Sequence, residues 1–199
     1  MGCMDETACN YNPDANMADG SCTYVEPYFN CDGTPQIGAS YQGGIVFYLD
    51  ETGQHGLIAA NEDISIKYQW GCFGTNVDGA EQSVLGTGYQ NTLDIVSDCQ
   101  TTPIAASVAL AYNNEGYVDW YLPSQNELQM MFSSIGPSSI FGNIAGFQTM
   151  YQNDNNIYWS STEYSGDYAI FGGIYSNGST TFQYNGKSSQ FRVRPIRSF

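Results

Sequence analysis

The positions of the six cysteines constrain this chain more than any other feature. Four lie within the first 31 residues: Cys3, Cys9, Cys22 and Cys31. That segment holds few large aliphatic side chains, so it cannot bury a core and needs covalent staples. Four cysteines permit three pairings, and the sequence does not choose among them. The other two, Cys72 and Cys99, are expected to form a disulfide that pins a loop to a helical region.

An even cysteine set, together with 22 glycines and only five basic residues, is typical of an oxidised, extracellular protein. The chain's 199 residues suffice for one sizeable domain and a small module. We expect residues 1–36 to form a cysteine- and aspartate-rich module with its linker, and residues 37–199 to form the main domain. Two prolines and a Cys-Asp-Gly turn in residues 26–35 predict an ordered bridge.

Charge excludes several classes of partner. Asp and Glu number 20 against five Lys and Arg, for a net charge of −15. Nucleic acids, anionic membranes and sulfated polysaccharides all require basic partners. No apolar run is long enough for a membrane span, and the first residues lack the pattern of a signal peptide. We therefore expect a fragment of a longer protein that acts outside the cell, at a cell surface or on a phage particle.

Side-chain oxygens in the N-terminal module have a spacing that suits a hard cation. The residues are Asn12, Asp14, Asn16 and Asp19, followed by a glycine turn. Several oxygens that converge from one short loop can hold Ca²⁺, although the spacing is not that of an EF-hand. The alternative is a loop of Asx turns that binds no metal.

Residues 2–24 resemble the Gly-Cys-Met-Asp, Ala-Cys-Asn-Tyr-Asn-Pro and Asp-Gly-Ser-Cys repeats of bacterial surface proteins, which are similar to thrombospondin type-3 calcium repeats. The chain departs from the repeat at Ala18, where a second aspartate is usual. The resemblance implies a stalk or spacer. One copy is present, so any array of repeats would lie outside this chain.

Alternation, glycines and capping signals predict the elements of the main domain. Strands are expected at residues 43–49, 55–60, 157–162, 168–175 and 180–184, with a strand-like run at 116–123 and a closing segment at 191–199. Helices are expected at residues 92–98, 104–112 and 125–132, with partial helix at 140–145. An Asn-Gly pair at 177–178 predicts a hairpin turn.

Several residues that invite a catalytic interpretation have a structural one. Ser124 and Glu127 have the spacing of a capping box, which accounts for the acid without catalysis. His55, the single histidine, lies beside a turn without a partner histidine or free cysteine, so a structural role is favoured. Gly86 and Gly88 suggest a phosphate loop, but no lysine follows them.

The last residues alternate apolar and basic side chains. Phe191 and Val193 are expected on one face and Arg192 and Arg194 on the other. Three of the five basic residues lie between positions 192 and 197. In so acidic a chain, internal pairing with carboxylates is the favoured role.

The chain resembles the C-type-lectin-fold domain at the C-terminus of bacterial collagen-like adhesins and of many lipoproteins. The motifs are Gly43-Gly-Ile-Val-Phe, Trp70-Gly-Cys, Gly86-Thr-Gly-Tyr-Gln-Asn-Thr, Trp120-Tyr-Leu-Pro-Ser-Gln-Asn-Glu-Leu, Tyr158-Trp-Ser-Ser-Thr-Glu-Tyr and Val193-Arg-Pro-Ile-Arg-Ser-Phe. The fold is shared with formylglycine-generating enzyme and with the variable proteins of diversity-generating retroelements. The resemblance implies an α+β fold in which two helices flank a small, twisted antiparallel sheet. It places the ligand face on the last strands and their loops.

The tract from Tyr164 to Asn185 has the composition of a binding surface, because rings alternate with small polar residues. The candidate contacts are Tyr164, Asp167, Tyr168, Ile170, Phe171, Tyr175, Asn177, Phe182, Tyr184 and Asn185. Strand alternation will turn roughly half of them inward. Only Gln183 in this tract belongs to the residue types that NNC codons cannot encode, which is compatible with diversification by a retroelement.

The leading hypothesis is an adhesin or receptor-binding domain for a protein or glycan on a cell surface. Catalysis like that of formylglycine-generating enzyme is not expected, because no cysteine follows Cys99. Calcium-dependent sugar binding of the animal lectin type requires a Glu-Pro-Asn or Gln-Pro-Asp motif that residues 37–199 lack. Calcium-independent glycan binding and a structural role as subunit or tip of a surface filament stay open, as does the oligomeric state.

Overall fold

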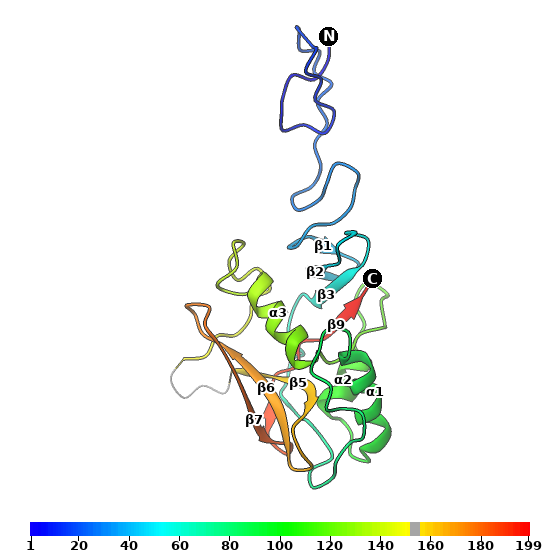
Figure 1. Ribbon diagram of the computed structural model, residues 1–199, viewed down its shortest axis with the longest axis vertical. Helices are drawn as coiled ribbons and strands as arrows, with labels where there is room; N and C mark the ends of the chain where they lie inside the picture. The colour runs from blue at the N-terminus through cyan, green and yellow to red at the C-terminus, as the bar shows by residue number, and fades with distance from the viewer. Residues whose placement is uncertain (152–155) are drawn as a thin grey trace.

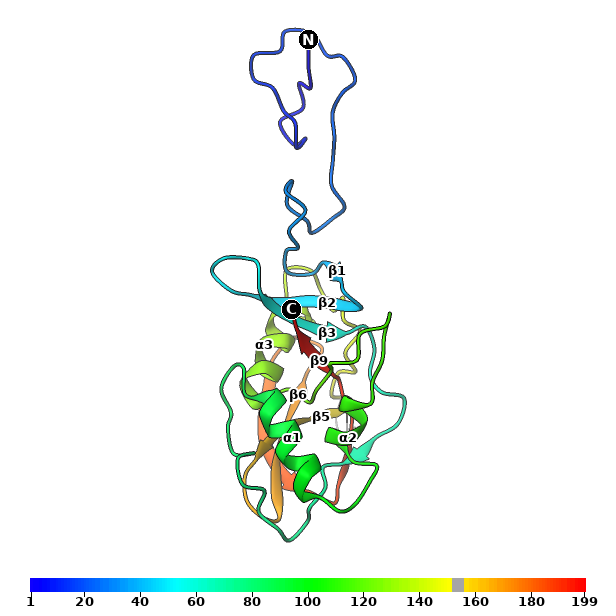
Figure 2. The same ribbon diagram turned by 90° about the vertical axis from the view of Figure 1, so that its right-hand side faces the viewer.

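The computed structural model describes residues 1–151 and 156–199. A narrow N-terminal extension leads into a wider α+β body, and the turn that joins the strands labelled β5 and β6 lies at the far end of that body (Figure 1). The C-terminus lies near the sheet through which the extension enters (Figure 2). The two chain ends of the body are thus on one side, which leaves the opposite end open to solvent.

The sheet next to the extension has the order β1-β2-β3-β9 and is antiparallel throughout. Its strands are β1 (Ser40–Tyr41), β2 (Gly44–Leu49), β3 (Gly56–Ala60) and β9 (Ile196–Ser198). Close strand approach requires glycine at two places. A β-carbon on Gly44 would lie 2.2 Å from the carbonyl oxygen of Ala59, and one on Gly56 would lie 2.2 Å from that of Tyr48.

The second sheet, with order β5-β6-β7, carries the predicted binding tract. Its strands are β5 (Ile157–Glu163), β6 (Tyr168–Ile174) and β7 (Thr180–Gly186). The predicted turn forms, with Gly178 at φ +83°, a conformation that glycine adopts without strain. A short pair, β4 (Tyr68–Gln69) with β8 (Gln190–Phe191), closes the body beside this sheet.

Three helices occur in the described residues: α1 (Gly88–Asp98), α2 (Ala105–Leu110) and α3 (Gln125–Ile135). The expected α+β class is confirmed, and the three helices correspond to those predicted at residues 92–98, 104–112 and 125–132. Helix α3 begins at the predicted capping box, in which Ser124 Oγ accepts a hydrogen bond from the Glu127 backbone. It packs against both β2 and β6 and so joins the two sheets.

Two predicted elements are wrong. Residues 140–145 form turns instead of helix, and Gly142 there has φ +70°. The run at 116–123 makes only isolated bridges, such as that between Tyr121 and Ile196. Helix α1 also starts four residues earlier than residue 92, at Gly88, whose carbonyl accepts a hydrogen bond from Thr92 Oγ1.

The core holds the three tryptophans, all fully buried: Trp70, Trp120 and Trp159. Trp70 Nε1 donates to the Ser160 carbonyl at 2.8 Å, and Trp159 Nε1 donates to the Tyr68 carbonyl at 2.9 Å. Each indole thus buries a large apolar area while its single donor is satisfied. The Cys72–Cys99 disulfide lies at the edge of this core and ties the loop after β4 to the end of α1.

Disulfides Cys3–Cys22 and Cys9–Cys31 hold the N-terminal extension together. Aromatic contacts join it to the body, with ring centroids 5.1 Å apart for Tyr28–Phe141 and 6.3 Å for Phe29–Tyr41. No helix in the described ranges has the length and apolar character needed to cross a bilayer.

Candidate functional site

Three exposed tyrosines gather at the end of the β5-β6-β7 sheet. The rings of Tyr164 and Tyr184 are parallel to within 2°, with centroids 4.2 Å apart. Tyr168 meets Tyr184 edge-on at 5.4 Å. The relative exposures are 58% for Tyr164, 43% for Tyr168 and 51% for Tyr184. We call this group, Tyr164, Tyr168 and Tyr184, the tyrosine surface.

The turn between β5 and β6 positions two of these rings. The backbone N–H groups of Tyr164 and Ser165 both donate to the Tyr168 carbonyl at 3.0 Å, and Tyr168 N–H donates back to Ser165 at 3.2 Å. The register pairs Ile170 with Tyr184, which brings the third ring to the same face. Because the backbone and register fix the rings before any ligand arrives, binding would cost little ordering entropy.

A buried ion pair supports the tyrosine surface from behind. Lys187 Nζ pairs with a Glu163 carboxylate oxygen, and both side chains are almost wholly buried. Lys187 Nζ also donates to the Thr75 carbonyl at 2.8 Å and lies 4.7 Å from the centre of the Trp70 ring. Glu163 accepts from the Val77 N–H at 3.0 Å. These contacts satisfy both charges and tie the turn to the loop at residues 74–80. Sequence reasoning missed the pair, although a lone lysine after a binding tract was a visible signal.

The structure places the other predicted contacts in three settings. Asp167 is exposed beside the tyrosine surface, and Ile170 is half-buried there. Phe171 is only 7% exposed and packs on Phe191 in the core, so it belongs to the inward-facing part of the predicted set. Phe182 is half-buried against Phe132 of α3, with centroids 6.2 Å apart, and belongs mainly to the packing of the sheet.

The remaining three predicted contacts serve turns or lie apart from the tyrosine surface. Asn177 Oδ1 accepts from the backbone N–H of Ser179 at 3.0 Å, which stabilises the hairpin turn. Asn185 Oδ1 accepts from the Gly186 N–H at 2.8 Å. Tyr175 is 39% exposed but lies in the β6–β7 turn region, at the other end of the hairpin.

The predicted cation ligands lie on the N-terminal loop, and two of them bond to that loop itself. Asn12 Oδ1 accepts from the Asp14 N–H, and Asp19 Oδ1 accepts from the Ser21 N–H, both at 3.0 Å. Hydrogen bonds from Ser21 hold the pKa of Asp19 below its usual value. Asp14 and Asn16 are both exposed. The loop therefore has the Asx turns of the metal-free alternative, a geometry that leaves further oxygen lone pairs for a cation.

The loop at Gly86, whose glycines suggest a phosphate site, binds a carboxylate of the protein itself. Glu127, fully buried, accepts from the backbone N–H of Gly86 at 2.8 Å and of Ser124 at 2.7 Å. A β-carbon on Gly88 would lie 2.2 Å from a Glu127 carboxylate oxygen. Burial raises the pKa of Glu127, while these N–H donors oppose the rise. Gly88 thus makes room for this internal carboxylate, and Gly86, at φ +89°, donates its N–H to it.

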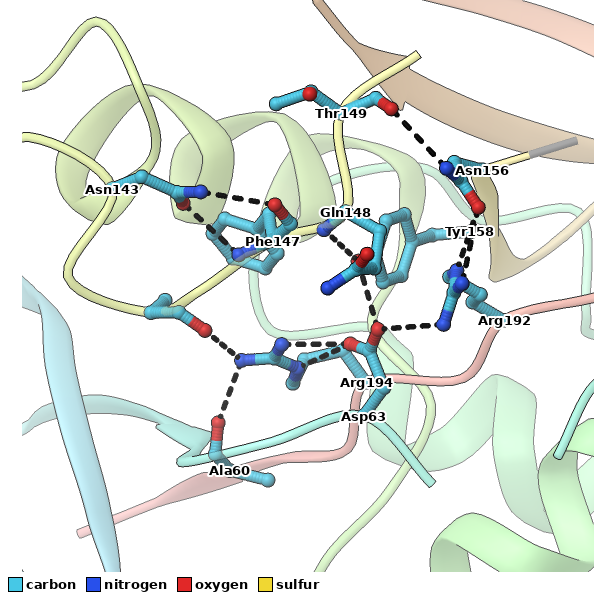
Figure 3. Close-up of polar contacts among 11 residues, drawn as sticks. Ala60, Asp63, Asn143, Phe147, Gln148, Thr149, Asn156, Tyr158, Arg192 and Arg194 are labelled. Carbon is cyan, nitrogen blue, oxygen red and sulfur yellow. Dashed lines mark hydrogen bonds and ion pairs between the residues drawn. The ribbon is translucent and has the colours of Figure 1, made fainter. Parts of the chain in front are cut away.

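Asp63 organises the C-terminal arginines, as Figure 3 shows. Arg194, 1% exposed, binds one carboxylate oxygen of Asp63 through Nε at 2.7 Å. Arg192 reaches the other at 3.3 Å, and Tyr158 donates to the same oxygen at 3.0 Å. Burial, and secondarily the Asp63 charge, raise the Tyr158 pKa. The predicted internal pairing of Arg192 and Arg194 is confirmed, and Arg197 likewise pairs with Asp119 at 2.7 Å.

Hollows in the surface lie elsewhere than the tyrosine surface. One of about 560 Å³ lies between residues 62–65 and the end of α2, with Tyr112 in its wall. Another, of about 230 Å³, is lined mainly by apolar atoms of Tyr48, Leu57 and Phe199. The tyrosine surface, whose three side chains are about half exposed, is an exposed platform. It can contact an extended or flat ligand without enclosing it.

Comparison with known proteins finds a likeness among solved structures. No protein-family model and no curated protein matches the chain. A solved fimbrial protein shares its fold. That protein, from Bacteroides ovatus, aligns with a TM-score of 0.51 at 17% identity, over 85% of this chain and 47% of its own. This chain thus spans about half of the fimbrial protein's length, and the likeness concerns fold alone.

Proposed function

We propose that this chain is an extracellular adhesin or receptor-binding domain that contacts its ligand through the tyrosine surface. The observation that carries the proposal is the pre-positioned cluster of Tyr164, Tyr168 and Tyr184, each ring about half exposed. Exposed tyrosines offer large amphipathic contact area at low entropic cost and are enriched where proteins bind one another. The domain is proposed to act without catalysing a reaction.

The place of the tyrosine surface in the molecule supports this role. The β5–β6 connection lies at the end of the body opposite the N-terminal extension (Figures 1 and 2). If the extension acts as a stalk, as its resemblance to surface-protein repeats implies, the tyrosine surface would be presented away from the anchoring side. Calcium bound by Asn12, Asp14, Asn16 and Asp19 would stiffen that stalk. Calorimetric titration of the full chain with Ca²⁺ tests this part separately.

The likeness to a protein titled as fimbrial supports a setting in a surface appendage. A C-type-lectin-like origin would place ligand contacts on these same last strands, and retroelement diversification would vary them. Sequencing of the surrounding DNA tests that refinement. It would reveal a reverse transcriptase gene and a near-copy of the codons for residues 164–185 that differs at adenines.

The decisive experiment compares matched tyrosine variants in binding. The full chain is applied to an array of glycans and purified surface proteins, with and without a chelator. A Tyr164→Ala, Tyr168→Ala, Tyr184→Ala triple variant should lose at least about tenfold in affinity for any ligand found. Tyr175→Ala, at the other end of the same hairpin, is the control and should bind normally. Equal binding by the triple variant and the wild type would refute the proposal.

A structural subunit of a surface filament is the second candidate, and only the fold likeness favours it. Such a subunit would assemble with other copies or with partner subunits, whereas a ligand-binding tip need not self-assemble. Sedimentation of the purified chain over a range of concentrations separates these roles.

A further inference from the structure

Strand β7 is an unprotected sheet edge. It forms one side of the β5-β6-β7 sheet, and its seven residues, Thr180–Gly186, include no charge and no proline. Its register with β6 runs through seven consecutive pairs without a shift. Proteins normally blunt such edges with charged residues, proline, bulges or very short strands, because exposed edges pair with other chains.

Other sheet edges in the described residues are protected. β1 has two residues and β9 has three. β5, on the other side of β7's own sheet, is buried at every position and carries an irregularity in its register. The contrast marks β7 as an edge kept open.

Hydrogen bonds at both ends of the hairpin show which β7 groups point outward. Tyr175 N–H donates to the Ser179 carbonyl, and Lys187 N–H donates to the Asp167 carbonyl, both at 2.9 Å. Hydrogen-bonded pairs alternate along an antiparallel ladder. Odd-numbered positions from 181 to 185 therefore bond to β6, and Thr180, Phe182 and Tyr184 direct their N–H and C=O groups away from it. None of these outward groups has a partner among the described residues outside the ladder.

The open edge reaches the tyrosine surface at Tyr184 and ends there. At Gly186 the outward N–H is already taken by Asn185 Oδ1, which in turn accepts from Ser189 Oγ at 3.0 Å. The edge therefore offers a window from Thr180 to Tyr184. A strand paired there would place alternate side chains on the face of Tyr184 and Tyr168.

Charge points to the chemistry of the occupant. Asp167 is exposed in the β5–β6 turn next to Tyr168, and the chain carries a net charge of −15. Four of the five basic residues are engaged in ion pairs: Lys187, Arg192, Arg194 and Arg197. An incoming strand with Lys or Arg at alternate positions would complement the carboxylates and contact the tyrosine faces by cation–π interaction. A second copy of this chain would bring another fifteen negative charges.

We propose that an extended, basic segment of a partner protein pairs with β7 and becomes the fourth strand of the β5-β6-β7 sheet. Main-chain hydrogen bonds to Thr180, Phe182 and Tyr184 would supply affinity, and the tyrosine surface would read alternate side chains. This inference rests on the proposed function, since it specifies how the tyrosine surface engages its ligand.

Amide hydrogen exchange of the full chain, followed by NMR, tests the proposal residue by residue. The probe is an end-blocked seven-residue peptide of alternating lysine and threonine. Without peptide, the amides of Thr180, Phe182 and Tyr184 should exchange much faster than those of Thr181 and Gln183. With peptide, the three outward amides should slow by at least about tenfold, as expected for ordered hydrogen bonds.

Matched peptides and variants sharpen the test. Replacing the peptide lysines with glutamates, or N-methylating its internal amides, should abolish the protection. Thr180→Pro removes one outward donor without breaking a bond to β6 and should weaken binding by about fivefold, whereas Thr180→Ser keeps the donor and should not.

Three results would overturn the inference. The first is no binding of the lysine peptide at millimolar concentration. The second is binding that depends on the tyrosine surface but leaves the three amides unprotected, which would retain the proposed function and reject strand addition. The third is concentration-dependent protection without peptide, which would assign the edge to a second copy. Failure of the proposed function shows separately, as array ligands that bind the triple tyrosine variant as tightly as the wild type.

Discussion

Single buried carboxylates determine how this chain holds its loops, and Glu127 is the clearest case. It accepts backbone hydrogen bonds from Gly86 and Ser124 while fully buried. Glu127→Gln should lower the free energy of unfolding by about 1–3 kcal/mol, because an amide nitrogen would face a backbone donor. Urea denaturation measures the loss. Gln129→Glu, the reverse exchange at an exposed position of α3, is the control and should change stability by less than about 0.5 kcal/mol.

Asp63 has a larger expected effect, because it neutralises an arginine that is almost wholly buried. Asp63→Asn should cost about 3–5 kcal/mol, the range for breaking a buried ion pair on one side. Glu62→Gln, at the exposed neighbouring position, should be nearly neutral. If the two variants unfolded at the same urea concentration, Asp63 would not be the organising residue that its contacts indicate.

Among the elements, β9 depends on pH through one ion pair. Arg197 binds both Asp119 oxygens, at 2.7 and 2.9 Å, and these hydrogen bonds hold the Asp119 pKa below its usual value. A depressed pKa stabilises the fold above the unfolded-state value, near 4, and this contribution disappears as pH falls through the folded-state value. The Asp119 side chain is 52% exposed, so screening should keep the contribution below about 1 kcal/mol.

Unfolding free energy measured from pH 7 down to about pH 2 should therefore fall less steeply in Asp119→Asn than in the wild type. Glu51→Gln, at an exposed turn position, serves as the control and should follow the wild-type curve. A steeper fall in the Asp119 variant would contradict the assignment of this pair to acid sensitivity.

The sequence predicted those elements whose signals are local. The hairpin of β2 and β3, the Ser124 cap and the Asn177–Gly178 turn all follow from residue type and spacing. The 140–145 helix failed because Gly142 within it and Gly146 just after it take left-handed backbone geometry that apolar periodicity does not reveal. Likewise, composition identified the rings of the binding tract, but only the pairing of β6 with β7 decides that Tyr184 faces solvent and Phe171 the core.

At the scale of the whole molecule, two disulfides stabilise the extension and one stabilises the body. Of residues 1–36, only Cys3, Ala8 and Pro35 are buried, so the extension contributes little to the body's core. Replacing Cys3, Cys9, Cys22 and Cys31 with serine should disorder the extension while the main thermal transition shifts by less than about 2 °C. Replacing Cys72 and Cys99, whose bridge spans 27 residues, should cost the body about 3 kcal/mol.

Calorimetry of the two variants, with NMR of the extension, separates these effects. Both variants lack disulfides but in different parts of the chain, so each is the matched control for the other. A large fall in the main transition when only the extension's cysteines are replaced would mean that the Tyr28 and Phe29 contacts couple the two parts energetically. The small expected shift would instead mean that the body folds without an ordered extension. The extension would then serve only to hold the tyrosine surface at a distance from the anchoring side.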